Sequence, residues 1–396
     1  MTEAENAQQQ IIPLIYDTPI KYPDRLITQF GVTPITSDLL ARFEKVTKQP
    51  AHQWLRRGIF FGHRDLELIL DDFENGKQIY LYSGRGPSST SLHIGHMPSF
   101  MFMKWLQDIF NAIVIIQIAD DEKVYFKNEP FEKIYQFGIE NSKDIIACGF
   151  NRDRTFIFSN RDYSRVPCFQ KVVCDIMKYT SINDVKAIFG IEPTMCLGAH
   201  MWPAYECAPC FSASFKNIFG DEQRRCLVVY GGDQDVFFRH SRNMAVKLSF
   251  HKPCSMIMDF LPALEGKSKM SSTVTSGLNT TIFMDDQPKD VYDKIKKYAH
   301  SGGKDTLKEH REKGANLEVD VSYKMLKFFE LDDIKLKQIG DDYGSGKLLS
   351  SEIKKIVSDK IIQLIEIHKK NRAAIDEKEL KHFYDLGKFT IKLSPE

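Results

Sequence analysis

The stretch that decides the fold is Ala112–Ala119, which reads AIVIIQIA. Apolar, mostly β-branched residues fill it without regular alternation, so it predicts a strand buried on both faces, as in a parallel sheet. Three further apolar runs predict strands, at Gln78–Tyr82, Thr155–Ser159 and Cys226–Tyr230. Helical patterns separate them, at His93–Phe110, Phe131–Cys148, most of 168–220, and from Gly231-Gly232 to Leu248. This alternation predicts an α/β fold whose parallel strands are joined by crossover helices.

Composition divides the chain into regions. The 396 residues carry 54 Lys and Arg against 53 Asp and Glu, and 42% are hydrophobic, which excludes a disordered or collagen-like chain. Residues 289–396 hold 23 basic and 20 acidic residues, whereas residues 1–288 hold 31 and 33 together with all Cys and Trp. After residue 288 only helical patterns recur. We therefore expect three parts: an extension at 1–76 with a disordered start at 1–15, an α/β domain at 77–288 with a helical insertion at about 150–220, and a helical domain at 289–396.

Membrane and secreted proteins are disfavoured by the same sequence. No stretch approaches the roughly 18 consecutive apolar residues that a membrane span needs. Met1–Gln10 is acidic and polar, unlike a signal peptide. The 8 Cys residues are too sparse for a disulfide scaffold. The sequence thus predicts a cytoplasmic protein with free thiols and no membrane partner.

The first chemical cluster, Ser83–His96, reads SGRGPSSTSLHIGH and joins a predicted strand to a predicted helix. Glycines permit close approach of a ligand, and free N–H groups at a helix start attract phosphate. Neither Gly-Lys-Ser/Thr nor G-x-G-x-x-G is present, so a P-loop is excluded and a dinucleotide fingerprint is disfavoured. His93 and His96 could hold a polyphosphate while a flat base packs against Gly95. The alternative is a tight turn with two solvated histidines.

The second cluster, Lys267–Ser272, reads KSKMSS. A small polar loop with two lysines could close over a triphosphate and follow the charge onto the leaving pyrophosphate. The alternative is a solvated surface loop. Both clusters lie beside predicted buried strands, with the α/β pattern between them.

Together the clusters resemble the two signatures of the class I aminoacyl-tRNA synthetases, H-I-G-H and a K-M-S-K-S-like loop; here the first is literal and the second reads KMSS. Further ordered segments are similar to the eukaryotic and archaeal tryptophanyl-tRNA synthetases over about residues 20–390, namely Leu55–Phe61, Tyr80–Ser89, Lys104–Asp108, Gln117–Lys123, Asp233–Asp235 and Ser301–Thr306. The resemblance implies a Rossmann-like catalytic domain, a helical anticodon-binding domain, activation of L-tryptophan with ATP, and transfer to tRNA(Trp).

The resemblance also implies site residues. The catalytic residues that it implies are His93, His96, Lys269, Ser271 and Ser272. The ATP-binding residues are Gly84, Arg85, Gly86, His93, Gly95, His96, Lys123, Lys269 and Met270. The tryptophan-binding residues are Tyr82, Gly84, Gln117, Glu122, Glu206 and Gln234. Tyr82 and Gln117 would accept the indole N–H hydrogen bond. Mg²⁺ is expected with ATP, held mainly by phosphate oxygens and water rather than by protein ligands.

Position 206 departs from the family pattern, because Glu206 stands where the family has Gln. A carboxylate there would strengthen a contact to the ammonium group of tryptophan but would repel its carboxylate. The family is homodimeric, which implies a homodimer with much of its interface in the helical insertion.

Three alternatives remain open. A tyrosyl-tRNA synthetase reads the phenol hydroxyl with a Tyr and an Asp, and the aligned Asp would fall near Pro209, so tryptophan is favoured. A catalytically silent paralogue that binds tRNA or a partner would usually have lost the ATP signature, which is intact here. A zinc site could use Cys196, His200, Cys207 and Cys210, although their spacing matches no known zinc pattern and ordinary thiols are favoured.

Overall fold

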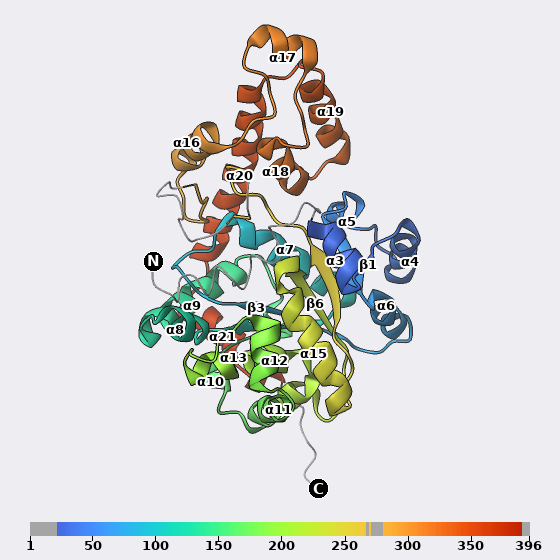
Figure 1. The fold of residues 1–396 in the computed structure, drawn as a ribbon, viewed down its shortest axis with the longest axis vertical. Helices are drawn as coiled ribbons and strands as arrows, with labels where there is room; N and C mark the ends of the chain where they lie inside the picture. The colour runs from blue at the N-terminus through green and yellow to red at the C-terminus, as the bar shows by residue number, and fades with distance from the viewer. Residues whose placement is uncertain (1–21, 267–268, 271–279, 390–396) are drawn as a thin grey trace.

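One seven-stranded sheet lies at the centre of the computed structural model, which describes residues 22–266, 269–270 and 280–389 (Figure 1). The strand order is β1-β2-β7-β6-β3-β4-β5. Strands β3 to β7 run parallel, whereas β2 is antiparallel to both β7 and β1. The strands are β1 Thr33–Pro34, β2 Phe60–Arg64, β3 Tyr80–Arg85, β4 Ile113–Ile118, β5 Thr155–Ser159, β6 Cys226–Gly231 and β7 Cys254–Met258.

Successive residues of the central strands pack on opposite faces of the sheet. In β4, Val114 and Ile116 join one hydrophobic core and Ile115 joins the other, as strand geometry requires. Helices cover both faces, α7 (Met97–Phe110) and α9 (Phe131–Ile146) on the first and α11 (Pro167–Lys178) and α15 (Asp235–Leu248) on the second. Double burial explains the apolar run of β4, and the predicted α/β fold with a parallel sheet is confirmed.

Near the first chemical cluster, two element boundaries differ from the sequence prediction. Strand β3 runs through Ser83–Arg85, beyond its predicted end at Tyr82, because these residues continue to pair with β4. The helix expected from His93 begins only at Met97, after the 3-10 turn η1 (Ile94–His96). His93 is extended, because its backbone pairs with Phe283 and the Ile94 N–H donates to Ile282 O at 2.9 Å.

The N-terminal region extends the sheet. Its helices are α3 (Tyr22–Phe30), α4 (Ser37–Thr47), α5 (Gln53–Arg56) and α6 (Leu66–Glu74). The side chain of Thr36 caps α4 by accepting from the Leu39 N–H at 3.2 Å. Strand β2 escaped prediction because its sequence, FFGHR, carries the buried polar residues His63 and Arg64.

The segment between β5 and β6 is helical apart from its turns, and it lies at the foot of the molecule in Figure 1. Its α-helices are α10 (Asn160–Tyr163), α11, α12 (Ile182–Phe189), α13 (Leu197–Cys207) and α14 (Lys216–Phe219). Helix α13 packs against α8 (Glu122–Lys127), which follows β4, with Gly198 beside Tyr125 and Trp202 beside Phe126. This contact positions α13 beside the carboxyl end of the sheet.

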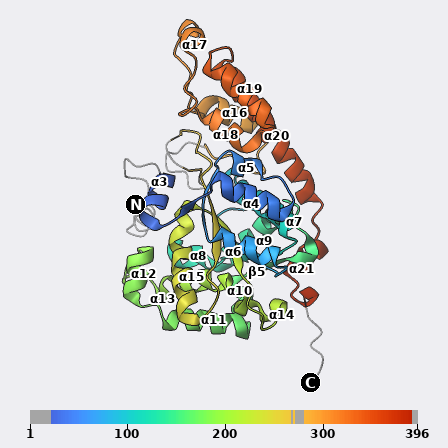
Figure 2. The ribbon, with the colours of Figure 1, turned by 90° about the vertical axis from the view of Figure 1, so that its right-hand side faces the viewer.

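After residue 288 the described chain is entirely helical in its regular structure. Its α-helices are α16 (Pro288–Tyr298), α17 (Leu307–Lys313), α18 (Val321–Phe329), α19 (Asp333–Gly344), α20 (Ser350–Ala373) and α21 (Glu377–Tyr384). Most of them stand above the sheet, but α20 runs down from this group along the sheet-containing body, and α21 packs on β5 (Figures 1 and 2).

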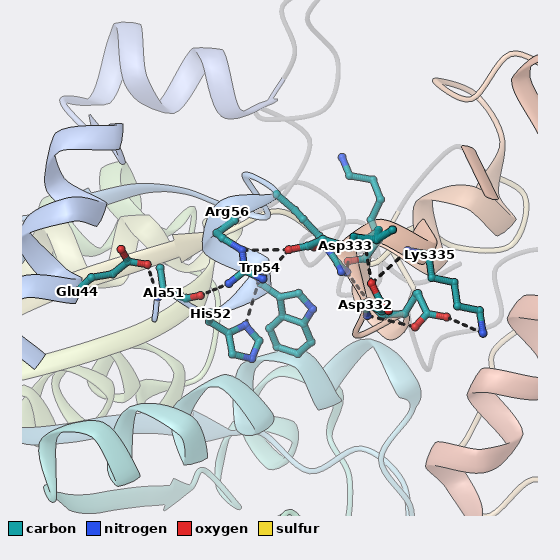
Figure 3. Close-up of polar contacts among 12 residues, drawn as sticks. Glu44, Ala51, His52, Trp54, Arg56, Asp332, Asp333 and Lys335 are labelled. Carbon is teal, nitrogen blue, oxygen red and sulfur yellow. Dashed lines mark hydrogen bonds and ion pairs between the residues drawn. The ribbon is translucent and has the colours of Figure 1, made fainter. Parts of the chain in front are cut away.

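The short helix α5 and the residue after it bind the helical domain through hydrogen bonds and ion pairs (Figure 3). The Trp54 indole N–H donates to Phe328 O at 2.8 Å, and the Arg56 Nε donates to Asp333 Oδ2 at 3.0 Å. Arg57 adds Nε to Asp333 Oδ1 at 2.6 Å. Helices far apart in sequence are thereby held together at the junction between domains. None of the helices in the described part of the chain has the length and apolarity needed to cross a membrane.

Candidate active site

The carboxyl ends of β3 and β6 lie side by side in the middle of the parallel part of the sheet. The chain leaves β3 toward β4 on one side and leaves β6 toward β7 on the other, so the sheet has its topological switch point between them. Open α/β sheets bind ligands in the crevice outside this point. Most of the predicted site residues for which the structure gives a position follow one of these central strands or lie on segments packed over them.

A polar pocket begins with Tyr82, Gly84 and Gln117. The Tyr82 hydroxyl donates to Gln117 Oε1 at 2.5 Å, and the Gln117 amide Nε2 donates to Asn160 Oδ1 at 2.8 Å and Tyr205 O at 3.0 Å. These bonds fix the amide so that its oxygen faces Tyr82. A hydroxyl that donates its proton to Gln117 keeps its lone pairs for an incoming donor. Tyr82 and Gln117 therefore offer acceptors to an N–H group of a ligand.

Gly84 provides space above these acceptors. A Cβ atom built on Gly84 would lie 3.5 Å from both Tyr82 Oη and Gln117 Oε1. Any larger side chain would occupy the volume directly over the two acceptor oxygens. Tyr82 and Gly84 are two residues apart on β3 and so lie on the same face of the sheet. Tyr82 therefore lines the bottom of the pocket, and Gly84 leaves the space beside it open.

Carboxyl groups crowd the same corner. Glu206, on the last turn of α13, has a buried Oε1 with no hydrogen-bond partner within the described structure. Burial, together with the nearby carboxylates of Glu122 and Asp121, raises the pKa of Glu206 well above its usual value. Burial also raises the pKa of Asp121 to about 7, although Asn160 Nδ2 donates to it at 2.9 Å. A cationic ammonium group would relieve this repulsion.

Glu122 and Lys123 link this corner to the next. Lys123 Nζ lies 2.6 Å from Glu122 Oε1, and both side chains are mostly shielded from solvent. A Cβ on Gly86 would lie 1.7 Å from Glu122 Oε2, so only glycine fits at position 86 while Glu122 keeps this position. Gly86 therefore lets the carboxylate of Glu122 lie against the backbone that follows β3.

The opposite side of the crevice is cationic. Arg85 is partly buried, and its guanidinium contacts three neutral groups: Asn141 Oδ1 at 3.0 Å, Ser88 Oγ at 3.3 Å and His96 Nε2 at 3.0 Å. Desolvation lowers the pKa of Arg85 to about 10, so the residue is still charged at neutral pH. A partly buried cation with neutral partners creates a local field that favours an anion.

His93 and His96 stack beside Arg85, with ring centroids 3.5 Å apart. Burial, with Arg85 and other cations nearby, lowers the pKa of His93 to about 3 and that of His96 well below its usual value. Both imidazoles are thus neutral near pH 7, and each has one N–H to donate. His93 Nδ1 is buried with no partner in the described structure, which leaves it available to a ligand or to water.

The two sequence clusters meet at Gly95. A Cβ on Gly95 would lie 3.2 Å from the Cβ of Met270 and 3.0 Å from His93 Nδ1, so the glycine allows the second cluster to lie against the first. Met270 is anchored through its N–H to Leu261 O at 3.1 Å. Lys269 forms an ion pair with Asp233, in the turn η5 (Gly232–Gln234) that follows β6. Both signatures therefore converge on one edge of the sheet.

Comparison with known proteins agrees with the arrangement of these two signature segments. The family model for class I tRNA synthetases of the W and Y types matches residues 74–195 and 217–366. The cytoplasmic tryptophan–tRNA ligase of Mus musculus is 46% identical over 363 residues, which cover 91% of this chain and 75% of that protein. This chain belongs to the tryptophanyl-tRNA synthetase family. The cytoplasmic tryptophan–tRNA ligase of Arabidopsis thaliana is 40% identical over 96% of this chain and 95% of its own length.

A solved structure shares the architecture of this synthetase chain. The tryptophanyl-tRNA synthetase of Plasmodium falciparum superimposes with a TM-score of 0.86 at 41% identity, covering 94% of this chain and 97% of that one. The family resemblance predicted from the sequence is confirmed, as is the Rossmann-like sheet with a helical C-terminal domain. Relatives at this level of identity carry the tryptophan name, which disfavours the tyrosyl alternative.

Most of the predicted residues lie together, with three exceptions. Gln234 lies in η5 beside Asp233, but its side chain is exposed. Ser271 and Ser272 lie outside the described residues. The remainder divide into the polar pocket and the cationic side described above, and their individual roles stay predictions.

Sequence reasoning missed the residues that act through others. Asn160 orients Gln117 and also binds Asp121, and Asn141 accepts from Arg85 while donating to Ser89 O at 2.8 Å. A usable signal existed for Asn160, because it follows the buried strand TFIFS directly, at the same sheet edge as Asp120. No comparable signal marks Asn141, which lies in the middle of α9.

The cysteines of the zinc alternative differ in their surroundings. Cys196 is exposed, whereas Cys207 and Cys210 are buried, and burial raises the pKa of both buried thiols. A buried thiol with a raised pKa is a poor metal ligand and a poor nucleophile. Across the described ranges, no group of three or more His, Cys, Asp or Glu side chains is arranged to hold a metal ion.

Proposed function

We propose that this protein is a cytoplasmic tryptophan–tRNA ligase, which activates L-tryptophan with ATP and transfers it to tRNA(Trp). The observation that carries the proposal is the convergence at one sheet edge of the two signature segments with a pocket that offers acceptors to an N–H group. The first segment includes the stacked His93 and His96, and Met270 of the second packs on Gly95. Tyr82 and Gln117 lie on the neighbouring strands.

In the first step, the tryptophan carboxylate attacks the α-phosphate of ATP, forming tryptophanyl-adenylate and releasing pyrophosphate. A carboxylate is already ionised at neutral pH, so this step needs no general base. Positioning and charge stabilisation must supply the catalysis. We assign the phosphates to the neutral donors His93 and His96 and to the cations Arg85, Lys123 and Lys269. In the second step, a hydroxyl of the terminal adenosine of the tRNA attacks the carbonyl carbon of the adenylate, which forms the tryptophanyl ester and releases AMP.

The remaining residues of the signature segments shape the nucleotide site. Gly95 leaves room for the adenosine, and Gly84 and Gly86 allow ATP to approach the end of β3. Lys269, with Met270, Ser271 and Ser272 of the same loop, follows the charge onto the pyrophosphate. In the structure Lys269 is paired with Asp233, so it must exchange that partner for phosphate when ATP binds.

Recognition of tryptophan uses the other side of the crevice. Its indole N–H donates to Tyr82 and Gln117, and Gly84 leaves space over these acceptors. Its ammonium group lies among Glu122 and Glu206. Gln234, by family resemblance, helps to orient the same end of the amino acid.

Mg²⁺ accompanies ATP in this proposal. When bound, it neutralises phosphate charge and orients the triphosphate. The site supplies cations and neutral donors on the phosphate side and offers no metal cage in the described residues. That donor set suits an ion coordinated by phosphate oxygens and water.

The helical domain, residues 289–396, is proposed to bind the anticodon, and the protein is proposed to act as a homodimer whose interface includes the helical insertion. Charge gives limited support, because residues 289–396 carry a net charge of +3 against −2 for the rest. Binding of tRNA should therefore be salt-sensitive and of moderate strength.

Pyrophosphate–ATP exchange tests the function directly. With wild-type protein, exchange should depend on added tryptophan and should not respond to tyrosine, because a site that hydrogen-bonds one side chain rejects an analogue lacking that group. Exchange stimulated by tyrosine alone would make the protein a tyrosyl enzyme. No exchange with any amino acid, by folded protein that binds RNA, would indicate the silent paralogue.

A further inference from the structure

Asp144 is a buried carboxylate outside the substrate pocket. It lies on α9 and has no measurable exposure to solvent. Its Oδ2 accepts from the Leu92 backbone N–H at 2.9 Å. Its Oδ1 accepts from His368 Nε2 at 3.1 Å and from Arg372 Nε at 2.8 Å. One carboxylate thus connects the segment before the first signature to the end of α20.

The lower end of α20 is fixed on the sheet-containing body around this carboxylate. Arg372 also donates to Glu140 Oε2 at 2.6 Å, Lys369 Nζ donates to Asp286 O at 2.5 Å, and Asn371 Nδ2 donates to Ala147 O at 3.2 Å. Helix α20 has 24 residues, so it spans about 36 Å. Its upper half belongs to the helical domain, where it packs on α16 and α18 (Figure 2). A single rigid element therefore joins the helical domain to Asp144.

Leu92 immediately precedes His93, the first histidine of the signature. On one side this segment is held by main-chain bonds, because the Met284 N–H donates to Leu92 O and the Ile94 N–H donates to Ile282 O, both at 2.9 Å. On the other side, Asp144 accepts the Leu92 N–H. Hydrogen bonds to a charged acceptor are stronger than neutral ones, and a buried N–H left without its acceptor is costly.

The tryptophan pocket is held by a separate set of bonds. Gln117 is oriented by Asn160, and Asn160 by Asp121. Among the described residues, no hydrogen bond joins these side chains to α20. A substitution at Asp144 should therefore weaken ATP binding and leave tryptophan binding unchanged.

We propose that Asp144 is a positioning residue for the ATP-binding segment, and that His368 and Arg372 of α20 hold Asp144 in place. Helix α20 thereby completes the ATP site from outside the catalytic domain. This inference rests on the proposed function, since it assigns the segment at His93–His96 to ATP.

Two variants and a control test the inference by steady-state exchange kinetics. Asp144→Asn has one oxygen and cannot accept from Leu92 and Arg372 together, so we expect the KM for ATP to rise about tenfold. Arg372→Gln removes a side chain that is 32% exposed and so should fold; we expect the KM for ATP to rise about threefold. In both variants the KM for tryptophan should stay at its wild-type value.

The matched control is Arg152→Gln. Arg152 pairs with Glu379 of α21 at 2.6 Å, so it also ties the C-terminal helices to the body, but it lies away from Leu92. Its two KM values should match those of the wild type. An equal rise of both KM values in Asp144→Asn and Arg372→Gln would overturn the inference. So would a fall in kcat and Tm with both KM values unchanged, which is the result expected of a merely structural residue.

Calorimetric titration with ATP separates this inference from the proposed function. If the wild type exchanges with no amino acid, the proposed function fails, and the Kd for ATP of the same variants then decides. A Kd raised in Asp144→Asn and Arg372→Gln but not in Arg152→Gln would support the positioning role. Equal Kd values in all four proteins would overturn it.

Discussion

The two sides of the crevice treat charge in opposite ways. On the ATP side, burial lowers the pKa values of Arg85, His93 and His96, so the histidines are neutral donors and the arginine keeps its charge. On the amino-acid side, burial raises the pKa values of Asp121 and Glu206. Desolvation disfavours the charged form in each case. For a histidine this lowers the pKa and favours loss of a proton, whereas for a carboxyl group it raises the pKa and favours retention of the proton.

This difference shows how one crevice can receive two dissimilar ligands. A triphosphate meets fixed cations and uncharged N–H donors, which attract it without the cost of holding additional buried charges before it arrives. An amino acid brings its own cation to a corner where three carboxyl groups lie close together and one of them, Glu206, has no hydrogen-bond partner for Oε1 in the described structure. Each side is thus completed electrostatically by the ligand proposed for it.

Removal of the Lys269 side chain from the ATP side should have the largest effect. Lys269→Ala is expected to lower the kcat of pyrophosphate exchange by about 10²–10³-fold, because a group that follows charge onto the leaving pyrophosphate acts mainly in the transition state. Varying tryptophan and ATP in the exchange assay measures both KM values. Lys216→Ala, which breaks an ion pair with Asp221 elsewhere on the surface, is the control and should change neither constant. A rise confined to the KM for tryptophan would mean that Lys269 belongs to the other side.

Loss of an acceptor from the amino-acid side should have a smaller and selective effect. Tyr82→Phe removes the hydroxyl that bonds Gln117, and we expect the KM for tryptophan to rise about tenfold, the cost of one lost hydrogen bond in a buried site. The KM for ATP should not change. Tyr80→Phe is the matched control, because Tyr80 lies two residues earlier on the same face and bonds Pro209 O at 3.0 Å. Similar kinetics for the two variants would argue that Tyr82 is only structural.

A methyl group added at Gly84 tests whether tryptophan occupies the space over Tyr82 and Gln117. In Gly84→Ala, the new Cβ would sit 3.5 Å from Tyr82 Oη and Gln117 Oε1, an ordinary contact that permits folding but fills ligand space. We expect the KM for tryptophan to rise about fivefold and Tm to be unchanged. Gly344→Ala, whose Cβ would lie 3.8 Å from its nearest neighbour in the helical domain, serves as the control. An unchanged KM for tryptophan would remove Gly84 from the pocket.

Sequence was sufficient for the parallel strands β3 to β6, because each is an apolar run buried on both faces. It was insufficient for β1, β2 and β7. In β2, buried His63 and Arg64 interrupt the apolar run, and Arg64 is tolerated there because it pairs with Asp235 at 2.8 Å, a partner 171 positions away. Pairings of that kind are created by the topology and leave no local pattern.

The same distinction applies to the site. His93, His96 and Lys269 were predictable because they stand in short motifs that the family resemblance could place. Asn141 and Asp144 were not, since each acts by orienting a residue from another element. Glu206 was named from the sequence, but its missing partner and its carboxyl neighbours became visible only once α13 was packed beside α8.

The smallest expected effect concerns the uncompensated carboxyl of Glu206. Because its pKa in the folded protein is raised above the usual 4.5, the folded state holds this proton more tightly than the unfolded chain does. Unfolding above that pH releases the proton, so Glu206 makes the free energy of unfolding fall as pH rises from the unfolded toward the folded pKa. Glu206→Gln removes this loss. Thermal scans should show a Tm about 2 °C above the wild type near pH 8, with the difference vanishing near pH 4. A difference that instead grew toward low pH would mean that Glu206 is ionised in the folded protein and already has a counter-charge, and the contrast between the two sides of the crevice would be lost.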